Sequence, residues 1–368
     1  MKKSIKLNNL IIILAAVTLV LQSCKKSVDY IVFNGNIYTV NDDFDTVSAF
    51  AVKDGKFIDV GNNEILSKYK TEEKIDLNGS TVLPGLIDAH CHFYGLGLNQ
   101  SVIDLTGTNS FNEILEKISK TDSKNIIRGR GWDQNDWEVK EFPNKTKLDV
   151  LYPQTPVVLE RIDGHAYLVN QKALDIAGID INTKSNNGTV LTKKGRLTGV
   201  LIDGPMSLID KAFGEVSLDD KINALLSAQE ICFKHGLTTV DDAGLSKDVI
   251  LLIDSLQKRK SLKMRVYAMI SNLENDVNYF IENGPIKTNS LNVRSVKVYG
   301  DGALGSRGAT LKEPYSDDIH NYGKLVTDVE SIKILAKKLS EANFQMNTHA
   351  IGDSTVNILI KAYSKVLE

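Results

Sequence analysis

The chain has little cysteine and no marked excess of charge. Three cysteines in 368 residues cannot form a disulfide framework. The formal net charge is −2, and no basic tract or aromatic–basic array is present, so we expect no nucleic-acid partner. No internal repeat or low-complexity tract is visible. The remaining composition, with 24% charged residues, is that of a globular protein long enough for more than one domain.

Long hydrophobic runs are also lacking, except near the N-terminus. Residues 10–21 are apolar apart from Thr18, too few to span a bilayer comfortably. Three lysines precede this run, at Lys2, Lys3 and Lys6. The run ends in Leu21-Gln22-Ser23-Cys24, which resembles a bacterial lipobox. We therefore predict a signal peptide over residues 1–23 and lipidation of Cys24. This would anchor the protein in the bacterial cell envelope, facing the periplasm or the exterior; a plain signal peptide or an anchor helix is the alternative.

Residues 29–80 alternate short apolar runs with turn residues. Strands are expected at 30–33, 37–40, 49–52 and 57–60, with a hairpin turn at Asp54-Gly55. This pattern predicts the N-terminal part of a small β-sandwich.

Two histidines end the next apolar segment, which reads Thr81-Val82-Leu83-Pro84-Gly85-Leu86-Ile87-Asp88-Ala89-His90-Cys91-His92. Residues i and i+2 of a strand point to the same face. His90 and His92 can therefore share a metal ion, whereas Ile87, Ala89 and Cys91 face the other way.

Strands alternate regularly with helices only late in the chain. Residues 94–224 mix a helix near 111–118 with irregular aromatic and polar segments, and we interpret them as an insertion that carries substrate contacts. Residues 225–368 then alternate helices with strands at 237–240, 263–270, 293–299 and 344–348. This rhythm is typical of a parallel sheet or barrel.

Two of these late strands carry polar residues facing away from their apolar neighbours. Lys297 lies between Val296 and Val298, so it is expected to point into the barrel. A buried lysine is costly, which fits a deprotonated, salt-bridged or carbamylated side chain; a lysine that reaches out to solvent is the alternative. His349 follows Gln345 and Asn347 on one face of the last strand.

The ordered motifs resemble the metal-dependent amidohydrolase superfamily, in the branch of N-substituted formamide deformylase-like proteins. The resemblance covers Asp29 to the end. It is carried by Gly85-Leu-Ile-Asp-Ala-His90-Cys-His92, Asp163-Gly164-His165, Asp242-Ala243-Gly244, Val296-Lys297-Val-Tyr-Gly-Asp301-Gly302, Gly305-Ser306-Arg307 and His349-Ala-Ile-Gly-Asp353.

This resemblance implies an α/β fold, a (β/α)8 TIM-type barrel with a flanking small β-sandwich and a large insertion after the first barrel strand. Segments 81–93 and 225–368 would supply about five βα units. The implied metal ligands are His90, His92, Lys297 and His349. Positions beside the metal or the substrate are His165, Trp132, Asp301 and Arg307, with turn structure or loop packing as the alternative for each.

The resemblance also implies ligands that this chain does not contain. No histidine follows His349, although the pattern expects one from the sixth strand and an aspartate from the eighth, which accepts the proton of the attacking water. We therefore assign no catalytic proton acceptor. We expect the barrel to be C-terminally incomplete and the chain by itself to be inactive.

The implied activity of the complete protein is hydrolysis of a non-peptide C–N bond in a small amide, formamide or cyclic amide. One or two divalent metal ions, zinc above all, would be held with a carboxylated Lys297; iron, manganese and nickel stay open. The alternatives are a lactonase- or phosphotriesterase-like hydrolase on the same metal site and a non-catalytic binding lipoprotein. Oligomeric state is not predicted.

Overall fold

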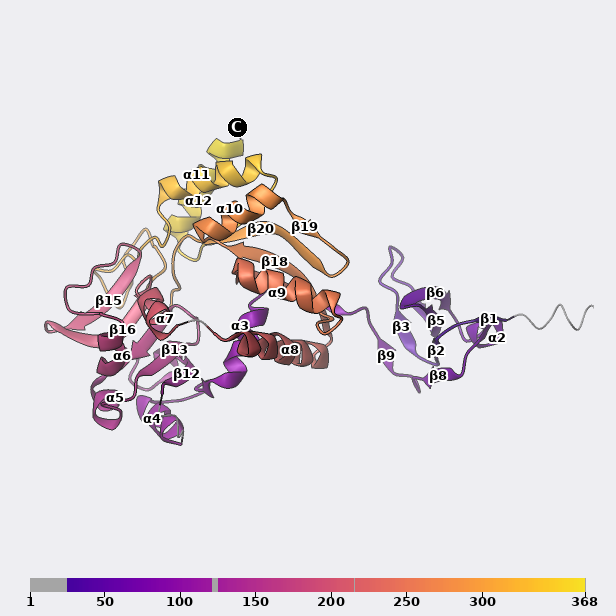
Figure 1. The fold of residues 1–368 in the computed structure, drawn as a ribbon, viewed down its shortest axis with the longest axis horizontal. Coiled ribbons are helices and arrows are strands. Elements are labelled where there is room, and N and C mark those ends of the chain that lie inside the picture. The colour runs from indigo at the N-terminus through magenta and orange to yellow at the C-terminus, as the bar shows by residue number, and fades with distance from the viewer. Residues whose placement is uncertain (1–24, 121–124, 215, 368) are drawn as a thin grey trace, which may run out of the picture. The chain divides into compact units, whose positions relative to one another are not determined.

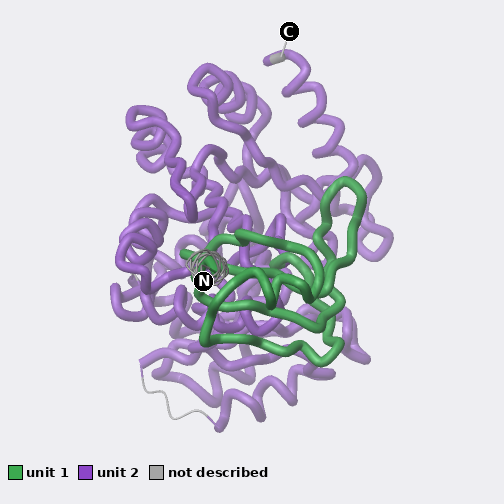
Figure 2. The backbone as a smooth tube through the Cα atoms, turned by 90° about the vertical axis from the view of Figure 1, so that its right-hand side faces the viewer, with its two compact units in different colours: residues 1–85 green, residues 86–368 purple. Residues whose placement is uncertain are grey.

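The computed structural model describes residues 25–120, 125–214 and 216–367. The chain divides into two compact units, Met1–Gly85 and Leu86–Glu368 (Figure 2). The predicted signal peptide 1–23 and Cys24 lie outside the described residues. Within the described part, no helix combines the length and the apolar character needed to cross a membrane.

The first unit is built from short strands. A four-stranded sheet has the order β6-β5-β2-β8, a three-stranded sheet has the order β4-β3-β9, and β1 pairs with β7. The elements are β1 (Lys26–Ser27), β2 (Tyr30–Phe33), β3 (Asn36–Tyr38), β4 (Thr46–Val47), β5 (Ala49–Lys53), β6 (Lys56–Gly61), α2 (Ile65–Lys68), β7 (Tyr69–Lys70), β8 (Glu73–Asp76) and β9 (Thr81–Val82). Its buried core contains Val28, Ile31, Ala49, Ala51 and Ile65. The strands expected at 30–33, 49–52 and 57–60 are present as β2, β5 and β6.

The boundary between the units differs from the expected one at residue 81. β9 pairs with β3 of the first unit, and the strand that carries the histidines is the separate β10 (Leu86–Cys91). Pro84 lies between them and has no N–H to give to a ladder, which explains the break.

A curled parallel sheet forms one half of the second unit (Figure 1). Its strands run in the order β10-β17-β18-β20-β21, all parallel, and β19 adds an antiparallel edge to β20. The strands are β17 (Leu237–Leu245), β18 (Arg265–Ser271), β19 (Ile286–Lys287), β20 (Leu291–Tyr299) and β21 (Gln345–His349). The result is an α/β fold with a half-barrel of five parallel strands.

Helices cover the outer face of this sheet. α8 contacts β17, α9 and α10 contact β18, and α11 contacts β21 and α12. They are α3 (Phe93–Leu98), the 3-10 turn η1 (Asn99–Ser101), α8 (Leu218–Lys234), α9 (Lys247–Lys258), α10 (Glu274–Asn283), α11 (Val329–Glu341) and α12 (Asp353–Leu367). The expected boundary at 224/225 falls inside α8, because the Ser217 side chain accepts the N–H of Asp220 and starts the helix earlier. The N-cap of α11 is Asp328, whose side chain accepts the N–H of Ser331.

The expected irregular insertion contains a second six-stranded sheet, in the order β11-β12-β13-β14-β16-β15. Its strands are β11 (Ile103–Asp104), β12 (Ile127–Trp132), β13 (Val157–Arg161), β14 (Ala166–Val169), β15 (Gly188–Lys193) and β16 (Arg196–Asp203). Its helices are α4 (Phe111–Ser119), η2 (Gln134–Asp136), α5 (Thr146–Leu151), α6 (Gln171–Ile176) and α7 (Met206–Phe213). Apolar clusters lie on both faces of this sheet, so the segment is a folded layer rather than a set of loops.

Candidate functional site

Lys297 and His90 meet across the curled sheet. The Nζ of Lys297, on β20, lies 3.2 Å from the Nε2 of His90, on β10. Three strand spacings separate β10 from β20, which would be about 14 Å in a flat sheet. The two side chains meet because the sheet curls. Lys297 is only 2% exposed, and it has no carboxylate partner among the residues that the structure describes.

His92 follows the last residue of β10 and precedes α3. Its ring centroid lies 6.2 Å from that of His90. As whole residues, His90 and His92 are exposed, although enough protein atoms surround the His92 imidazole to desolvate it. Desolvation, with the positive charge of Lys297 adding to it, lowers the pKa of His92. The imidazole is therefore neutral near pH 7, the form that ligates metal ions.

His349 ends β21 and is held by one ring nitrogen. Its Nε2 lies 3.3 Å from the carbonyl oxygen of Gly302 and 4.0 Å from the Oδ1 of Asp301. Burial lowers the pKa of His349. A neutral ring that donates from Nε2 has its lone pair on Nδ1, so Nδ1 is the atom available to a ligand.

His165 comes from the second sheet and stacks on His349. The two ring centroids are 5.1 Å apart and the planes are tilted by 36°. The Nδ1 of His165 is 2.7 Å from the Oδ1 of Asp203. Burial acts to lower the pKa of His165, but the hydrogen bond and charge of Asp203 outweigh it and the pKa is raised.

Tyr299 lies between the Lys297–His90 pair and the His349–His165 pair. Its ring is 5.3 Å from the Nζ of Lys297 and 5.8 Å from the ring of His349. Neither Tyr299 nor Asp203 was predicted from the sequence. Tyr299 could have been found from its position two residues after Lys297, because residues i and i+2 of a strand share a face. Asp203 could have been noticed as the acidic residue that directly follows the apolar run Val200-Leu201-Ile202.

Trp132 lies in the apolar core of the second sheet. It is completely buried, and its indole N–H donates to the Leu159 carbonyl at 2.9 Å. Its neighbours are Trp137 and Phe142. These contacts are those of a core residue, which is the packing alternative that the sequence left open. The place of Trp132 beside the substrate stays a prediction.

Asp301 and Arg307 organise the loop after β20. The buried Asp301 carboxylate accepts three backbone N–H groups, from Thr310 at 2.9 Å, Ile351 at 3.0 Å and Gly352 at 2.8 Å. It thereby ties this loop to the turn after His349. Arg307 donates to the Gly305 carbonyl at 2.7 Å and pairs with Asp317. Both side chains hold the loop, and Asp301 also lies close to His349.

The donor chemistry of this group fits a divalent metal ion. The imidazole nitrogens of His90, His92 and His349 are donors that zinc accepts. Lys297 Nζ lies 3.2 Å from His90 Nε2, and a carbamate formed on Nζ would supply an oxygen ligand. Residues that fit as ligands are His90, His92, Lys297 and His349. Over residues 25–120, 125–214 and 216–367, however, no three His, Cys, Asp or Glu side chains already converge closely enough to enclose an ion.

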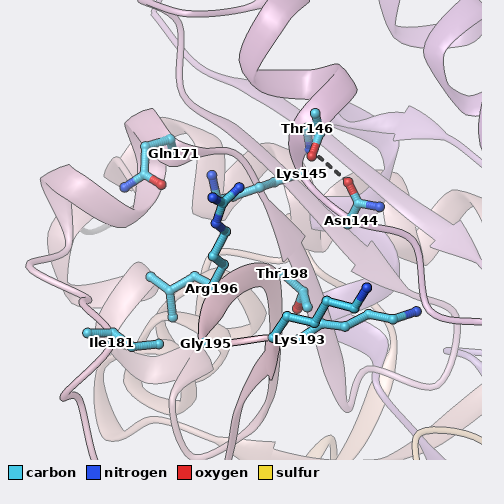
Figure 3. Close-up of a pocket in the computed structure, with 11 residues that line it drawn as sticks. Asn144, Lys145, Thr146, Gln171, Ile181, Lys193, Gly195, Arg196 and Thr198 are labelled. Atoms are coloured by element: carbon cyan, nitrogen blue, oxygen red, sulfur yellow. Dashed lines mark hydrogen bonds between the residues drawn. The ribbon is translucent and has the colours of Figure 1, made fainter.

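A cavity of another kind lies beside the tip of the β15–β16 hairpin (Figure 3). It measures about 820 Å³ and is lined in part by Lys145, Lys193, Lys194 and Arg196. Lys145 is already paired with Asp149 at 2.6 Å. None of the predicted site residues lines this cavity.

Comparison with known proteins agrees with the α/β fold and with a metal-dependent hydrolase. A model of the amidohydrolase family matches residues 73–368. The putative amidohydrolase YtcJ of Bacillus subtilis is 34% identical over 347 residues, which cover 90% of this chain and 65% of that protein. The N-substituted formamide deformylase of Arthrobacter pascens is 23% identical, over 92% of this chain and 66% of its own length. The chain thus spans about two thirds of the length of these relatives.

A solved structure shares the fold over nearly the whole chain. It is an uncharacterized metal-dependent hydrolase from Pyrococcus horikoshii, with a TM-score of 0.69 and 26% identity, covering 91% of this chain and 68% of that one. Together with the family match over residues 73–368 and the relative at 34% identity, this likeness shows that the chain belongs to the amidohydrolase family.

Proposed function

We propose that the protein is a metal-dependent hydrolase that cleaves a non-peptide C–N bond in a small amide, formamide or cyclic amide. The observation that carries the proposal is the contact of the buried Lys297 Nζ with His90 Nε2 at 3.2 Å. A buried amine with no carboxylate partner is costly. A carbamate formed on this amine would be an anion, and a metal ion shared with His90 would pair with it and remove that cost.

The proposed ligands are His90, His92, Lys297 and His349, with zinc as the first metal to test. A divalent ion there supplies water of lowered pKa and polarises a substrate carbonyl. The chain's own residues then bind and orient the substrate. Tyr299 and His165 border His349 and form the wall that a small amide would touch.

The amide substrate class is inferred from the relatives. One relative is named for deformylation of N-substituted formamides, and the family is that of the amidohydrolases. Because one fold supports many chemistries, a lactonase- or phosphotriesterase-like activity on the same site is the rival, and a binding lipoprotein without turnover is the second.

A substrate panel distinguishes these functions. This chain and a version extended to a complete eight-stranded barrel are each purified, supplied with Zn²⁺ or Mn²⁺ and tested with an N-alkylformamide, an N-alkylacetamide, a lactam, a lactone and a phosphotriester. We expect the extended version to release amine from at least one amide, and its His90→Ala variant and the chain by itself to release none. Turnover of the lactone or phosphotriester alone would support the rival hydrolase. Binding of an amide without turnover by the metal-loaded extended version would support the binding lipoprotein.

We also propose that Cys24 is lipidated and anchors the protein to the bacterial envelope. The support is the sequence Leu21-Gln22-Ser23-Cys24 after an apolar run. Wild-type protein is expected to partition into detergent, and Cys24→Ser to remain in the aqueous phase. Equal partitioning of both forms contradicts this proposal.

A further inference from the structure

Asp203 touches the candidate site from the end of β16. Its side chain is 7% exposed, and its Oδ1 lies 2.7 Å from the Nδ1 of His165. Its backbone N–H also donates to the His165 carbonyl at 3.1 Å. Both the backbone and the side chain of Asp203 are therefore tied to one residue.

The backbone of Asp203 is held in a conformation that few residues other than glycine adopt. Its φ is +56°. Such strain costs of order 1–3 kcal/mol and persists only where the surroundings enforce it, most often at functional sites. Asp203 does not relax to the extended conformation of the strand that it ends.

Two glycines of the loop after β20 lie against the other carboxylate oxygen. A Cβ built on Gly308 would lie 2.6 Å from the Oδ2 of Asp203, and a Cβ on Gly302 would also collide with it. Neither glycine has a positive φ, so the reason for glycine here is the close approach of the carboxylate. The loop and Asp203 fit together only without side chains at these positions.

The His165 ring is consequently fixed between Asp203 and His349. Because Nδ1 faces a carboxylate, Nδ1 carries the proton and Nε2 is the other hydrogen-bonding atom of the ring. Nε2 has no protein partner among the described residues. The side chain is 14% exposed, so a small molecule can reach it.

We propose that Asp203 is a positioning residue, packed against Gly302 and Gly308, that orients His165 so that its Nε2 hydrogen-bonds the amide group of the substrate beside His349. This inference rests on the proposed amidohydrolase function for the substrate. The orientation of the ring, however, is a property of the protein alone. The two parts can therefore be tested separately.

The orientation is tested by NMR on protein labelled with ¹⁵N-histidine. Two-bond ¹H–¹⁵N correlations report which ring nitrogen carries the proton, and His165→Gln identifies the His165 signals. We expect a protonated Nδ1 in the wild type and loss of this pattern in Asp203→Ala and in Gly308→Ala. Gly308→Ala serves if Asp203→Ala does not fold. Gly61→Ala is the control, because its added Cβ meets only Ile65 Cδ1 at 3.8 Å.

The substrate contact is tested by a double-mutant cycle in the extended version, with the amide that the panel shows to be hydrolysed fastest. Asp203→Ala and His165→Ala are each expected to lower kcat/KM by roughly 10- to 100-fold. If Asp203 acts through His165, the double variant is no worse than His165→Ala. The content of bound Zn²⁺ should stay that of the wild type.

Three results would overturn the inference. One is an unchanged His165 pattern in both Asp203→Ala and Gly308→Ala. Another is additive loss of kcat/KM, which would mean that Asp203 acts without His165. The third is loss of Zn²⁺ from Asp203→Ala as complete as from His90→Ala. If no amide is hydrolysed, the proposed function and the substrate contact fail together, and the NMR result still decides the role of Asp203 in orienting the ring.

Discussion

Lys297 is 2% exposed, and its Nζ has a histidine nitrogen at 3.2 Å and an aromatic ring at 5.3 Å as its neighbours. Among residues 25–120, 125–214 and 216–367 it pairs with no carboxylate, and it does not reach solvent; these were two alternatives left open by the sequence. Burial lowers its pKa, which favours the neutral amine. A neutral amine adds to CO₂: the N–C bond forms and a proton leaves to solvent, giving an anionic carbamate.

Carbamylation of Lys297 is the first prediction. Protein supplied with Zn²⁺ and ¹³C-bicarbonate should give a carbamate ¹³C resonance that Lys297→Ala lacks. The exposed Lys287 is the matched control, and Lys287→Ala should keep the signal. A carbamate signal that survives in Lys297→Ala would show that another amine reacts.

Asp242 is a second buried ionisable residue with a strongly altered pKa. It is 2% exposed on β17, and its Oδ2 accepts the N–H of Tyr94 at 2.9 Å. Burial raises its pKa from 3.8 to about 7. The folded state therefore binds this proton more tightly than the unfolded state does. The stabilising effect is complete below pH 3.8 and is lost as the pH rises through about 7.

Asp242→Asn should remove this pH dependence, because an amide oxygen still accepts the Tyr94 N–H and carries no charge. Between pH 4 and pH 7, the variant is expected to gain stability relative to wild type by up to about 1.4 kcal/mol per pH unit. Urea unfolding at several pH values measures the difference. Parallel stability curves for the two proteins would contradict the prediction.

Helix α3 connects the histidine strand to the rest of the second unit. It begins directly after His92 and packs against α8. A Cβ on Gly97 would lie 2.7 Å from the Ala224 Cα of α8, with the backbone carbonyl nearer still. Gly97 is therefore required by the close approach of two helices.

Gly97→Ala should separate α3 from α8 and lower the free energy of unfolding by about 1–3 kcal/mol. Gly95→Ala in the same helix is the control, since its Cβ would meet only His92 Cβ at 3.5 Å. Alanine is a better helix former than glycine, so Gly95→Ala should be neutral or stabilising. Thermal unfolding of both variants measures the contrast, and equal melting temperatures would contradict it.

The alternation of side chains between the two faces of a strand predicted strands well where apolar residues recur at every second position. On β20, Val296 and Val298 are completely buried as expected. β12 was missed because its sequence, Ile127-Arg-Gly-Arg-Gly-Trp132, contains residues that strands disfavour. Tertiary contacts compensate for them: Gly129 lets Leu105 and Leu159 pack closely, and Arg130 pairs with Glu160 at 3.2 Å.

Side-chain roles in the site were predictable only in part. The i, i+2 spacing of His90 and His92 and the register of Lys297 follow from the period of a strand. The contact between Lys297 and His90 depends on how far the sheet curls, which no local pattern encodes. The role of Asp203 depends on two glycines about a hundred residues later in the chain, and so could not be predicted locally.

At the scale of the whole molecule, all four proposed ligands belong to the second unit, Leu86–Glu368. The first unit has its own core, in which Ile31 is completely buried. Ile31→Ala should destabilise the first unit by about 2–5 kcal/mol and leave bound metal unchanged. The control is Val60→Ala, at a position 45% exposed. Metal lost in proportion to the destabilisation would mean that the ligand set depends on the first unit.

The content of bound metal tests the central claim most directly. Wild type, His90→Ala/His92→Ala and the control His235→Ala, which changes a histidine outside the proposed ligand set, are purified identically and analysed for zinc, iron, manganese and nickel. Wild type and His235→Ala should carry a divalent metal, and the double variant should have lost it, because removing two of four ligands leaves too few donors. Equal metal content in all three proteins would contradict the assignment of this site.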